Sequence, residues 1–436
     1  MRKRSAVLVA AALLLAVTGC SGTTAKSGTA AAPTDPTKVS GDITVLTHKT
    51  DLYQDGTLAK YAAEFNKIYP NVHVKFDAIV NYEGDVKVRM NSDNYGDVLM
   101  IPAAVPVPDY PKFFAPLGTT DEMSKKYLFM DHESYNGQVY GIPTNGNANG
   151  LIYNKQVWQQ AGITSWPKSI DEFMADLQAI KTKTSSTPLY TIYHEMWPMT
   201  AWQFNLGSNT CDTKSNDNLA TDTAPWAAGK ELNTIDSMLY NVVHNKLDEA
   251  DPTTTAWESA KSGIATGKIG TLMLASWAIS QMQVAAKTAG TDPNNIGFMP
   301  FPAQVGGHYC SIIQADYAEG ISIHSQHKDA ARAWADWFVD KSTFAQDQDL
   351  LPTLKNAALP PALKTYQDNG AQFIQLTHDK NALVTKIDNQ SEIGLNKPDY
   401  RQHIVDLARG AASGGLDAYF ADLNKKWSDA IKAAGS

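Results

Sequence analysis

The stretch that decides the fold is residues 137–162, GQVYGIPTNGNANGLIYNKQVWQQAG. Its first apolar run ends at Pro143, which cannot donate a hydrogen bond to a sheet ladder. The segment 144–150 that follows is too rich in Asn and Gly for the interior of a helix or strand. A second apolar run, 151–154, leads into a pattern typical of a helix. The stretch therefore predicts two strands joined by a break rich in amide side chains, as expected where a chain crosses between two lobes.

On either side of this stretch, the apolar periodicity alternates between that of strands and that of helices. Residues 43–46 form a short apolar run, 58–69 carry apolar residues at helical spacing, and 72–76 alternate as in a strand. This β-α-β order predicts an α/β fold with mainly parallel sheets covered by helices. The capping box at 169–172 predicts the start of a helix. Residues 296–302 have the pattern of a strand with a proline break, which predicts a second crossing.

The N-terminus has the pattern of a secretory signal. Residues 2–4 are basic, and residues 6–17 are apolar but too few to span a membrane as a stable helix. The run of small residues that ends at Cys20 is similar to the lipobox of bacterial lipoproteins. That resemblance implies removal of residues 1–19, lipidation of Cys20, and anchoring at the extracellular face of the cytoplasmic membrane. A plain signal peptide with an incidental cysteine is the alternative.

Composition and charge describe the remainder of the chain. Residues 20–40 are rich in Ser, Gly, Thr, Ala and Pro and predict a flexible tether, so the folded part is expected to begin near Gly41. The full chain of 436 residues, 43% hydrophobic and 19% charged, is long enough for two domains. Without residues 1–19 it carries 34 basic and 45 acidic residues, a formal charge of −11. This acidic balance argues against nucleic acid as a partner.

Four blocks of the sequence together resemble a known family. They are residues 43–74 with the ending YPNVHVKF, residues 140–181, residues 267–277 (GKIGTLMLASW) and residues 296–339. Their order and spacing are similar to those of the extracellular solute-binding protein family 1, the sugar-binding lipoproteins of ABC importers. The resemblance implies a carbohydrate ligand, with an oligosaccharide expected, ABC permease subunits as partners, a monomer, no cofactor and no enzymatic activity.

The same resemblance implies a two-lobe type II periplasmic-binding-protein fold with the ligand between the lobes. Carried over to this chain, lobe one comprises residues 41–145 and 301–345. Lobe two comprises residues 146–300 and 346–436. The lobes are expected to close on the ligand about hinges near 145–149 and 299–302.

Two cysteines, Cys211 and Cys310, remain after the lipobox. A disulfide between them is possible in an oxidising compartment. The family's lobe bounds place them in different lobes, where a bond would restrict lobe motion. We therefore expect them to be unpaired.

Candidate ligand contacts lie just after the strand ends, because open α/β sheets bind ligands beyond the carboxyl ends of their strands. A sugar needs planar amide or carboxylate partners beside an aromatic ring. Trp277, after the GTLMLAS strand, is the main candidate for stacking. The ligand-binding candidates are Trp277, His48, Asp51, Tyr82, Glu83, Asn145, Asn147, Asn149, Trp197, Trp202, Asp316, Tyr317 and Glu319.

Motifs of enzymes and metal sites are lacking in the sequence. There is no nucleophile elbow, Walker loop or dinucleotide fingerprint. His194-Glu195 begins like a zinc-protease motif, but its second histidine is missing, and the pair His324 and His327 has no evident third ligand. Spacing alone does not exclude a pair of catalytic carboxylates. The alternatives to a sugar-binding protein are the same fold with a non-sugar solute, and a surface polysaccharide hydrolase.

Overall fold

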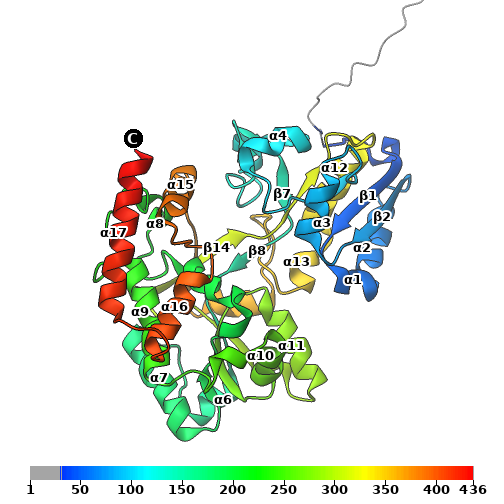
Figure 1. The fold of residues 1–436 in the computed structure, drawn as a ribbon. Helices are drawn as coiled ribbons and strands as arrows, with labels where there is room; N and C mark the ends of the chain where they lie inside the picture. Colours follow the sequence, from blue (N-terminus) through cyan, green and yellow to red (C-terminus); the bar gives the residue numbers. More distant parts are fainter. Residues whose placement is uncertain (1–29, 31, 436) are drawn as a thin grey trace, which may run out of the picture.

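The computed structural model describes Ala30 and residues 32–435, which form two α/β lobes joined by crossing segments (Figure 1). The expected signal segment and Cys20 lie outside the described residues. We use "lobe one" for Ala30 with residues 32–143 and 318–350, and "lobe two" for residues 147–314 and 361–435. The chain passes between the lobes at 144–146, at 315–317 and within 351–360.

Lobe one is built on a five-stranded sheet. Its strands, in spatial order, are β2 (Val72–Ala78), β1 (Gly41–Thr47), β3 (Val98–Met100), β15 (Ala318–Ile321) and β7 (Gly141–Pro143). The pairings of β1 with β2 and β3 are parallel, as the β-α-β order predicts. Strand β15 is antiparallel to both of its neighbours, because it returns from the other lobe. The sheet is therefore mixed rather than mainly parallel.

Helices cover both faces of this sheet. They are α1 (Thr50–Gln54), α2 (Thr57–Asn66), α3 (Tyr82–Arg89), α12 (Lys328–Lys341) and α13 (Phe344–Asp347). Trp334 and Trp337 of α12 pack against Phe65 of α2, with ring centroids 5.3 and 5.5 Å away. Both tryptophans are buried and belong to the core of lobe one.

An insertion between β3 and β7 forms the outer part of lobe one. It contains α4 (Tyr110–Phe113), β4 (Gly118–Thr119), α5 (Thr120–Met123), β5 (Ser134–Tyr135) and β6 (Gln138–Val139). Strands β4, β6 and β5 form a small antiparallel sheet. The segment between α5 and β5 reaches toward lobe two, where Phe129 joins the core of that lobe.

Lobe two has a four-stranded sheet surrounded by helices. Its strands, in spatial order, are β10 (Thr187–Leu189), β11 (Ile269–Met273), β9 (Leu151–Asn154) and β12 (Ile296–Met299). The helices are α6 (Lys155–Gln160), α7 (Ile170–Lys183), α9 (Glu231–His244), α10 (Trp257–Ala265) and α11 (Ala278–Thr288). The Ser169 hydroxyl accepts a hydrogen bond from the amide of Glu172 at 3.2 Å, which confirms the predicted helix start.

A second sheet in lobe two leads to the crossing. It contains β13 (Gln304–Val305), β14 (His308–Ala315), β16 (Ala371–Gln375) and β8 (Gly146–Ala148), with β14 paired to all three others. The chain does not leave lobe two at the expected proline break. Phe301 is fully buried in the lobe-two core, and the chain crosses only after Ala315.

The C-terminal part of the chain packs on lobe two. It comprises α14 (Pro361–Asp368), α15 (Asn381–Ser391), α16 (Asp399–Ala408) and α17 (Leu416–Ala434). Arg401 of α16 and Asp236 of α9 form an ion pair of 2.8 Å between fully buried side chains. The other Asp236 oxygen accepts a hydrogen bond from the indole of Trp226, so the pair is well satisfied.

Two expectations about the chain need correction. Ala30 is buried on lobe one, where its amide donates to the Pro116 carbonyl at 2.9 Å, so chain ordered against the fold begins well before Gly41. Cys211 and Cys310 are joined by a disulfide, with Cα atoms 5.5 Å apart. The prediction of unpaired cysteines is wrong because strand β14, with Cys310, belongs to lobe two and not to lobe one.

Candidate functional site

A cavity of about 450 Å³ lies between the lobes, where the carboxyl end of β1 faces the start of α11. Its floor is formed by β8 and by the crossing that follows β14. The lining residues are His48, Lys49, Asp51, Leu52, Phe344, Gln348 and Leu350 on one side, and Asn147, Trp277, Ser280, Gln281, Gln314, Ala315 and Asp316 on the floor and the other side. We call this cavity the cleft.

Trp277 occupies the position directly before the first residue of α11. It is half-buried and packs against the hydrophobic cores of both lobes. Its ring centroid lies 5.9 Å from that of Trp197 and 5.8 Å from that of Trp257, and these two are 5.3 Å apart. We call these three residues the tryptophan cluster; Trp277 lines the cavity, and the other two rings lie directly beside it in lobe two.

Asp316 forms the acidic floor of the cleft. It accepts hydrogen bonds from the side-chain amides of Asn145 at 3.1 Å and Asn147 at 3.4 Å. Burial raises the pKa of Asp316, but the positive charge of Lys49 and the Asn145 hydrogen bond outweigh it and hold the pKa below its usual value. The carboxylate is therefore ionised at neutral pH and can accept hydrogen bonds from a ligand.

Asn147 carries an unsatisfied acceptor into the cleft. Its side chain is 6% exposed, and its Oδ1 has no hydrogen-bond partner among the described residues. An unpaired buried polar atom costs about 1–3 kcal/mol. A ligand hydroxyl that donates to this oxygen would recover that cost.

His48 lies at the end of β1, beside the cleft floor. Its ring centroid is 4.7 Å from that of Tyr317 and 5.9 Å from that of Tyr82, and Nδ1 is 3.0 Å from the sulfur of Met100. Burial, together with the charge of Lys49, lowers the pKa of His48 to about 4. The imidazole is therefore neutral at physiological pH.

Other predicted residues support this floor without lining it. The Tyr317 hydroxyl donates to Glu83 Oε1 at 2.6 Å, and the Tyr82 hydroxyl donates to the Met100 carbonyl at 2.9 Å. Asn145 is fully buried under Asp316. These contacts fix the positions of His48 and Asp316 from behind.

Three predicted residues lie away from the cleft. Trp202 is 1% exposed within the lobe-two core, because η4 (Trp197–Asn205) turns it inward. Glu319 is 3% exposed on β15 next to Trp334, and burial raises its pKa to about 8. Asn149 lies on the lobe-two side of β8, where its carbonyl accepts from the Ser311 hydroxyl at 2.8 Å. The structure does not bring these three to the ligand cavity.

Some residues that line the cleft or lie beside it were not predicted from the sequence. Lys49, Gln281 and Gln348 have no pattern that separates them from ordinary surface residues. Trp257 stands at the first position of a helix, and only the packing of α10 beside α11 brings it to Trp277.

The family model described as bacterial extracellular solute-binding protein matches residues 50–343. The chain belongs to this family.

Solved structures of the family's fold agree over nearly the whole chain. The binding protein BlMnBP1 from Bifidobacterium animalis subsp. lactis, in complex with mannobiose, is 32% identical, with a TM-score of 0.81 over 92% of this chain and 96% of that one. BlMnBP2 from the same organism, in complex with mannotriose, is 31% identical, with a TM-score of 0.80 over 91% and 95%. The fold is that of a type II periplasmic binding protein.

Curated relatives match a smaller part. The multiple sugar-binding protein of Streptococcus mutans is 26% identical over 286 residues, which span 63% of this chain and 65% of that protein. The melibiose/raffinose/stachyose-binding protein MelE of Bacillus subtilis is 27% identical over 42% of each chain. The chain thus matches less than two thirds of the length of these relatives.

The described residues lack two further features. No helix within residues 32–435 is both long and apolar enough to cross a membrane. Nor does the described part of the chain contain a group of three or more His, Cys, Asp or Glu side chains placed to hold a metal ion.

Proposed function

We propose that this protein captures a carbohydrate in the cleft and delivers it to an ABC importer. The observation that carries the proposal is the arrangement of Trp277 beside the ionised Asp316 and the unsatisfied Oδ1 of Asn147, all in one cavity. A sugar presents a C–H face that packs on an aromatic ring, and hydroxyls that donate to such acceptors. The cavity volume falls within the range of roughly 300–1,000 Å³ of small-molecule sites.

The proposed ligands are mannobiose and mannotriose. Both are bound by the solved relatives that share about a third of this sequence over nearly its whole length. The tryptophan cluster supports an oligosaccharide, because three rings beside one another offer more stacking surface than one sugar unit covers.

The roles of the site residues follow from their positions. Trp277, with Trp197 at its side, would stack on the sugar, while Asp316, Asn147, His48 and Asp51 would bind hydroxyls. Asn145, Tyr82, Glu83 and Tyr317 would hold these groups in place. The proposed site also includes Lys49 and Gln281, because both line the cavity.

Cellular placement completes the proposal. The basic-apolar-Cys order of residues 1–20 supports a lipoprotein that is anchored through Cys20 at the extracellular face of the cytoplasmic membrane. There it would act as a monomer that presents its ligand to the permease subunits, with no turnover of the sugar.

Calorimetric titration of the purified protein with mannobiose and mannotriose tests the proposal. We expect saturable binding of at least one of the two and weaker binding of raffinose. Chromatography of mannotriose after prolonged incubation with the protein should show no shorter product. Absence of binding to every sugar in a wider carbohydrate panel would refute the carbohydrate assignment, and release of mannobiose or mannose would refute the purely binding role.

A further inference from the structure

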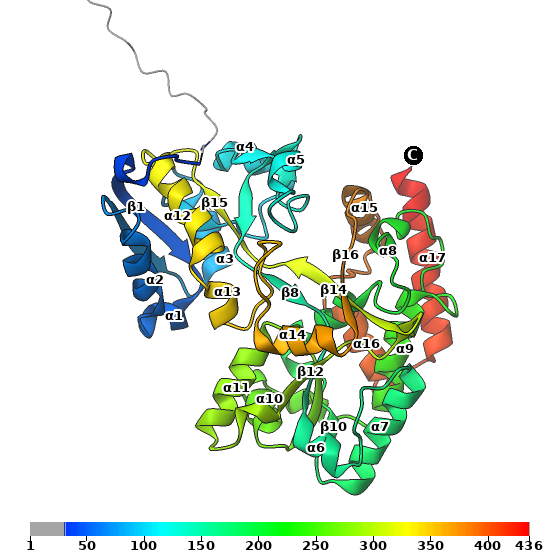
Figure 2. The same cartoon turned by 180° about the vertical axis from the view of Figure 1, so that it is seen from behind.

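A second cavity lies on lobe two, outside the cleft. Its volume is about 950 Å³, against about 450 Å³ for the cleft. The cavity is bounded by α6 and the turn after it, by α11, by β12 and by α14, which lie together at this side of lobe two (Figure 2). The residues that line it are all different from those that line the cleft. We call it the lobe-two cavity.

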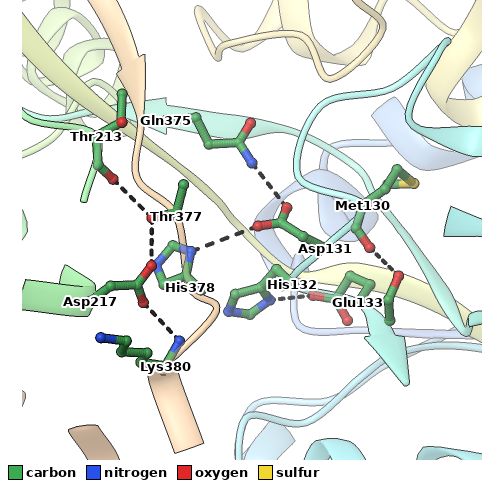
Figure 3. A network of polar contacts seen from close by, with 11 residues as sticks. Met130, Asp131, His132, Glu133, Thr213, Asp217, Gln375, Thr377, His378 and Lys380 are labelled. Carbon is green, nitrogen blue, oxygen red and sulfur yellow. Dashed lines mark hydrogen bonds and ion pairs between the residues drawn. The ribbon is translucent and has the colours of Figure 1, made fainter. Parts of the chain in front are cut away.

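The wall of the lobe-two cavity comes almost entirely from one lobe. Asp349 is the exception among its lining residues. Polar contact between the lobes is found beyond the cavity, at the end of β16, where the Gln375 side-chain amide donates to Asp131 at 2.9 Å (Figure 3). The last lining residue, Asn369, precedes that strand. The shape of the cavity is therefore set within lobe two and does not depend on contact between the lobes.

Trp166 gives the lobe-two cavity a flat ring whose position is fixed. It lies in the turn between α6 and α7, directly before Pro167. The indole N–H donates to the Tyr153 hydroxyl at 3.2 Å, and the Tyr309 hydroxyl donates to the Trp166 carbonyl at 3.2 Å. The ring centroids of Tyr309 and Tyr366 lie 6.0 and 5.8 Å from that of Trp166. Despite these contacts Trp166 is only half-buried, so part of its ring stays open to the cavity.

Side-chain amides line the same cavity. They belong to Gln159 of α6, Gln283 of α11 and Gln304 of β13. The side chains of Gln159 and Gln283 make no hydrogen bond to any described residue, so their donors and acceptors are free for a ligand. Beneath them lies β12, the edge strand of the four-stranded sheet. A Cβ at Gly297 of this strand would lie 2.5 Å from the Tyr153 ring, so glycine is needed for that ring to pack here.

The charged groups of the lobe-two cavity do not favour a charged ligand. Lys155 Nζ donates to the Asn294 carbonyl at 2.9 Å, and burial lowers the pKa of this lysine. Asp349 is half-buried, and burial raises its pKa. Lys155 is thus engaged within the protein, and the remaining charges, Lys168 and Asp349, have opposite signs. The cavity therefore lacks a free cluster of one charge, which a phosphate or a polyamine would need.

From this lining we propose that the lobe-two cavity is a second carbohydrate site, which takes a neutral oligosaccharide. A sugar has a C–H face that packs on a flat ring such as Trp166, and hydroxyls that both donate to amides and accept from them. A volume about twice that of the cleft favours several sugar units over one. The protein would then hold one saccharide in the cleft and another on lobe two at the same time. Because no cleft residue takes part, the inference does not rest on the proposed function.

Saturation-transfer NMR tests the inference on the purified protein, with mannohexaose, cellohexaose and maltohexaose as probes. Trp277→Ala combined with Asp316→Ala first disables the proposed cleft site. In this background we expect at least one hexasaccharide still to receive saturation from the protein. Trp166→Ala should then weaken its binding roughly threefold to tenfold, as for loss of one stacked ring. Gln159→Ala should weaken it roughly twofold to tenfold, as for loss of one hydrogen bond.

Gln160→Ala is the matched control for Gln159→Ala. Gln160 is the next residue of α6 and is exposed like Gln159, but it does not line the cavity, so its removal should leave binding unchanged. Trp166→Phe keeps a smaller ring and should give an intermediate affinity. Thermal melts of every variant show whether it is folded. If the cleft-disabled background is unstable, the same substitutions are compared in the parent protein with excess mannobiose present.

Three results would overturn the assignment. The first is that no hexasaccharide binds once the cleft is disabled in a folded protein. The second is binding that stays unchanged in folded Trp166→Ala and Gln159→Ala. The third is binding of an extended peptide in place of any hexasaccharide, which would make the cavity a site for strand addition to the edge of β12. Conversely, mannotriose binding that does not depend on Trp277 or Asp316 would refute the proposed cleft site and leave the result for lobe two standing.

Discussion

The side-chain amide of Asn145 donates a hydrogen bond of 3.1 Å to the carboxylate of Asp316, so the first crossing segment is bound directly to the second. The backbone repeats the connection, since the Asp316 amide donates to the Asn145 carbonyl at 2.9 Å. The acidic floor of the cleft thus sits on the axis about which the lobes would turn. A ligand that binds Asp316 would contact the segments that connect the two lobes. Asp316 is therefore a suitable first target for mutation.

Asp316→Asn should weaken sugar binding at least about tenfold, which corresponds to 1.4 kcal/mol. The substitution keeps the shape but replaces a charged acceptor, and hydrogen bonds to charged groups are roughly twice as strong as neutral ones. Titration calorimetry with mannotriose measures the change. Asp51→Asn, at an exposed position of the cleft rim, is the matched control and should cost less than about threefold; equal losses at both positions would argue against a special role for Asp316.

Trp277→Ala should lower sugar affinity by at least about tenfold, because stacking and the buried area of the ring are both lost. Its half-buried side chain also packs on both cores, so a modest fall in melting temperature should accompany the loss. Trp202→Ala provides the comparison, since truncation of that fully buried ring should cost about 3–5 kcal/mol of stability. Unchanged affinity in Trp277→Ala would show that the residue serves packing alone.

Stability should fall on acidification in a way that depends on His48. The folded-state pKa of about 4 lies below the ordinary value of 6.5, so the unfolded chain binds a proton more readily. The contribution of His48 is therefore complete above pH 6.5 and is lost between pH 6.5 and 4, by at most about 3 kcal/mol. Urea unfolding at several pH values should show a smaller slope in this window for His48→Gln; an identical slope would contradict the assignment.

Removal of the disulfide should cost stability and leave binding intact. Cys211→Ser with Cys310→Ser should lower the free energy of unfolding by about 2–4 kcal/mol, because the bond constrains the unfolded chain. Both cysteines lie in lobe two, so the bond does not restrain lobe motion. Reduction of the parent protein should reproduce the effect in thermal melts, whereas a tenfold change in mannotriose affinity would show that the bond acts on the cleft.

Cys20→Ser should abolish attachment to the membrane. Without the thiol no lipid can be added, and the protein should appear in the medium or remain as uncleaved precursor. Fractionation and immunoblotting of the producing cells measure this. Mature-length protein that stays with the membrane fraction would exclude Cys20 as the anchor.

Local patterns predicted the elements that depend on local chemistry. The capping box at Ser169 and the β-α-β start of lobe one are both set by residues close in sequence. The place of Trp277 could be predicted for the same reason, because small residues after an apolar strand mark the end of the strand. The comparison with the family's order of blocks supplied the overall fold.

The parts that the sequence did not predict depend on tertiary packing. The proline break after Met299 looks like a crossing, but Phe301 fills the core of lobe two and holds the chain there until Ala315. That single displacement of the crossing also explains the mistaken separation of Cys211 from Cys310. Trp257 could not be identified, because only the packing of α10 beside α11 brings it to Trp277. Lys49 follows the predicted His48 directly, but nothing in its pattern separates it from an ordinary surface lysine.

The burial of Ala30 bears on how the protein would be attached to the membrane. Its carbonyl accepts a hydrogen bond from the buried Arg332 of α12, so the first described residue is fixed on lobe one. If Cys20 carries the lipid, about ten residues separate the membrane anchor from Ala30, and such a segment spans at most ~36 Å when fully extended. Lobe one would then be held near the membrane. Lobe two would be the lobe that rotates relative to the bilayer and to the permease.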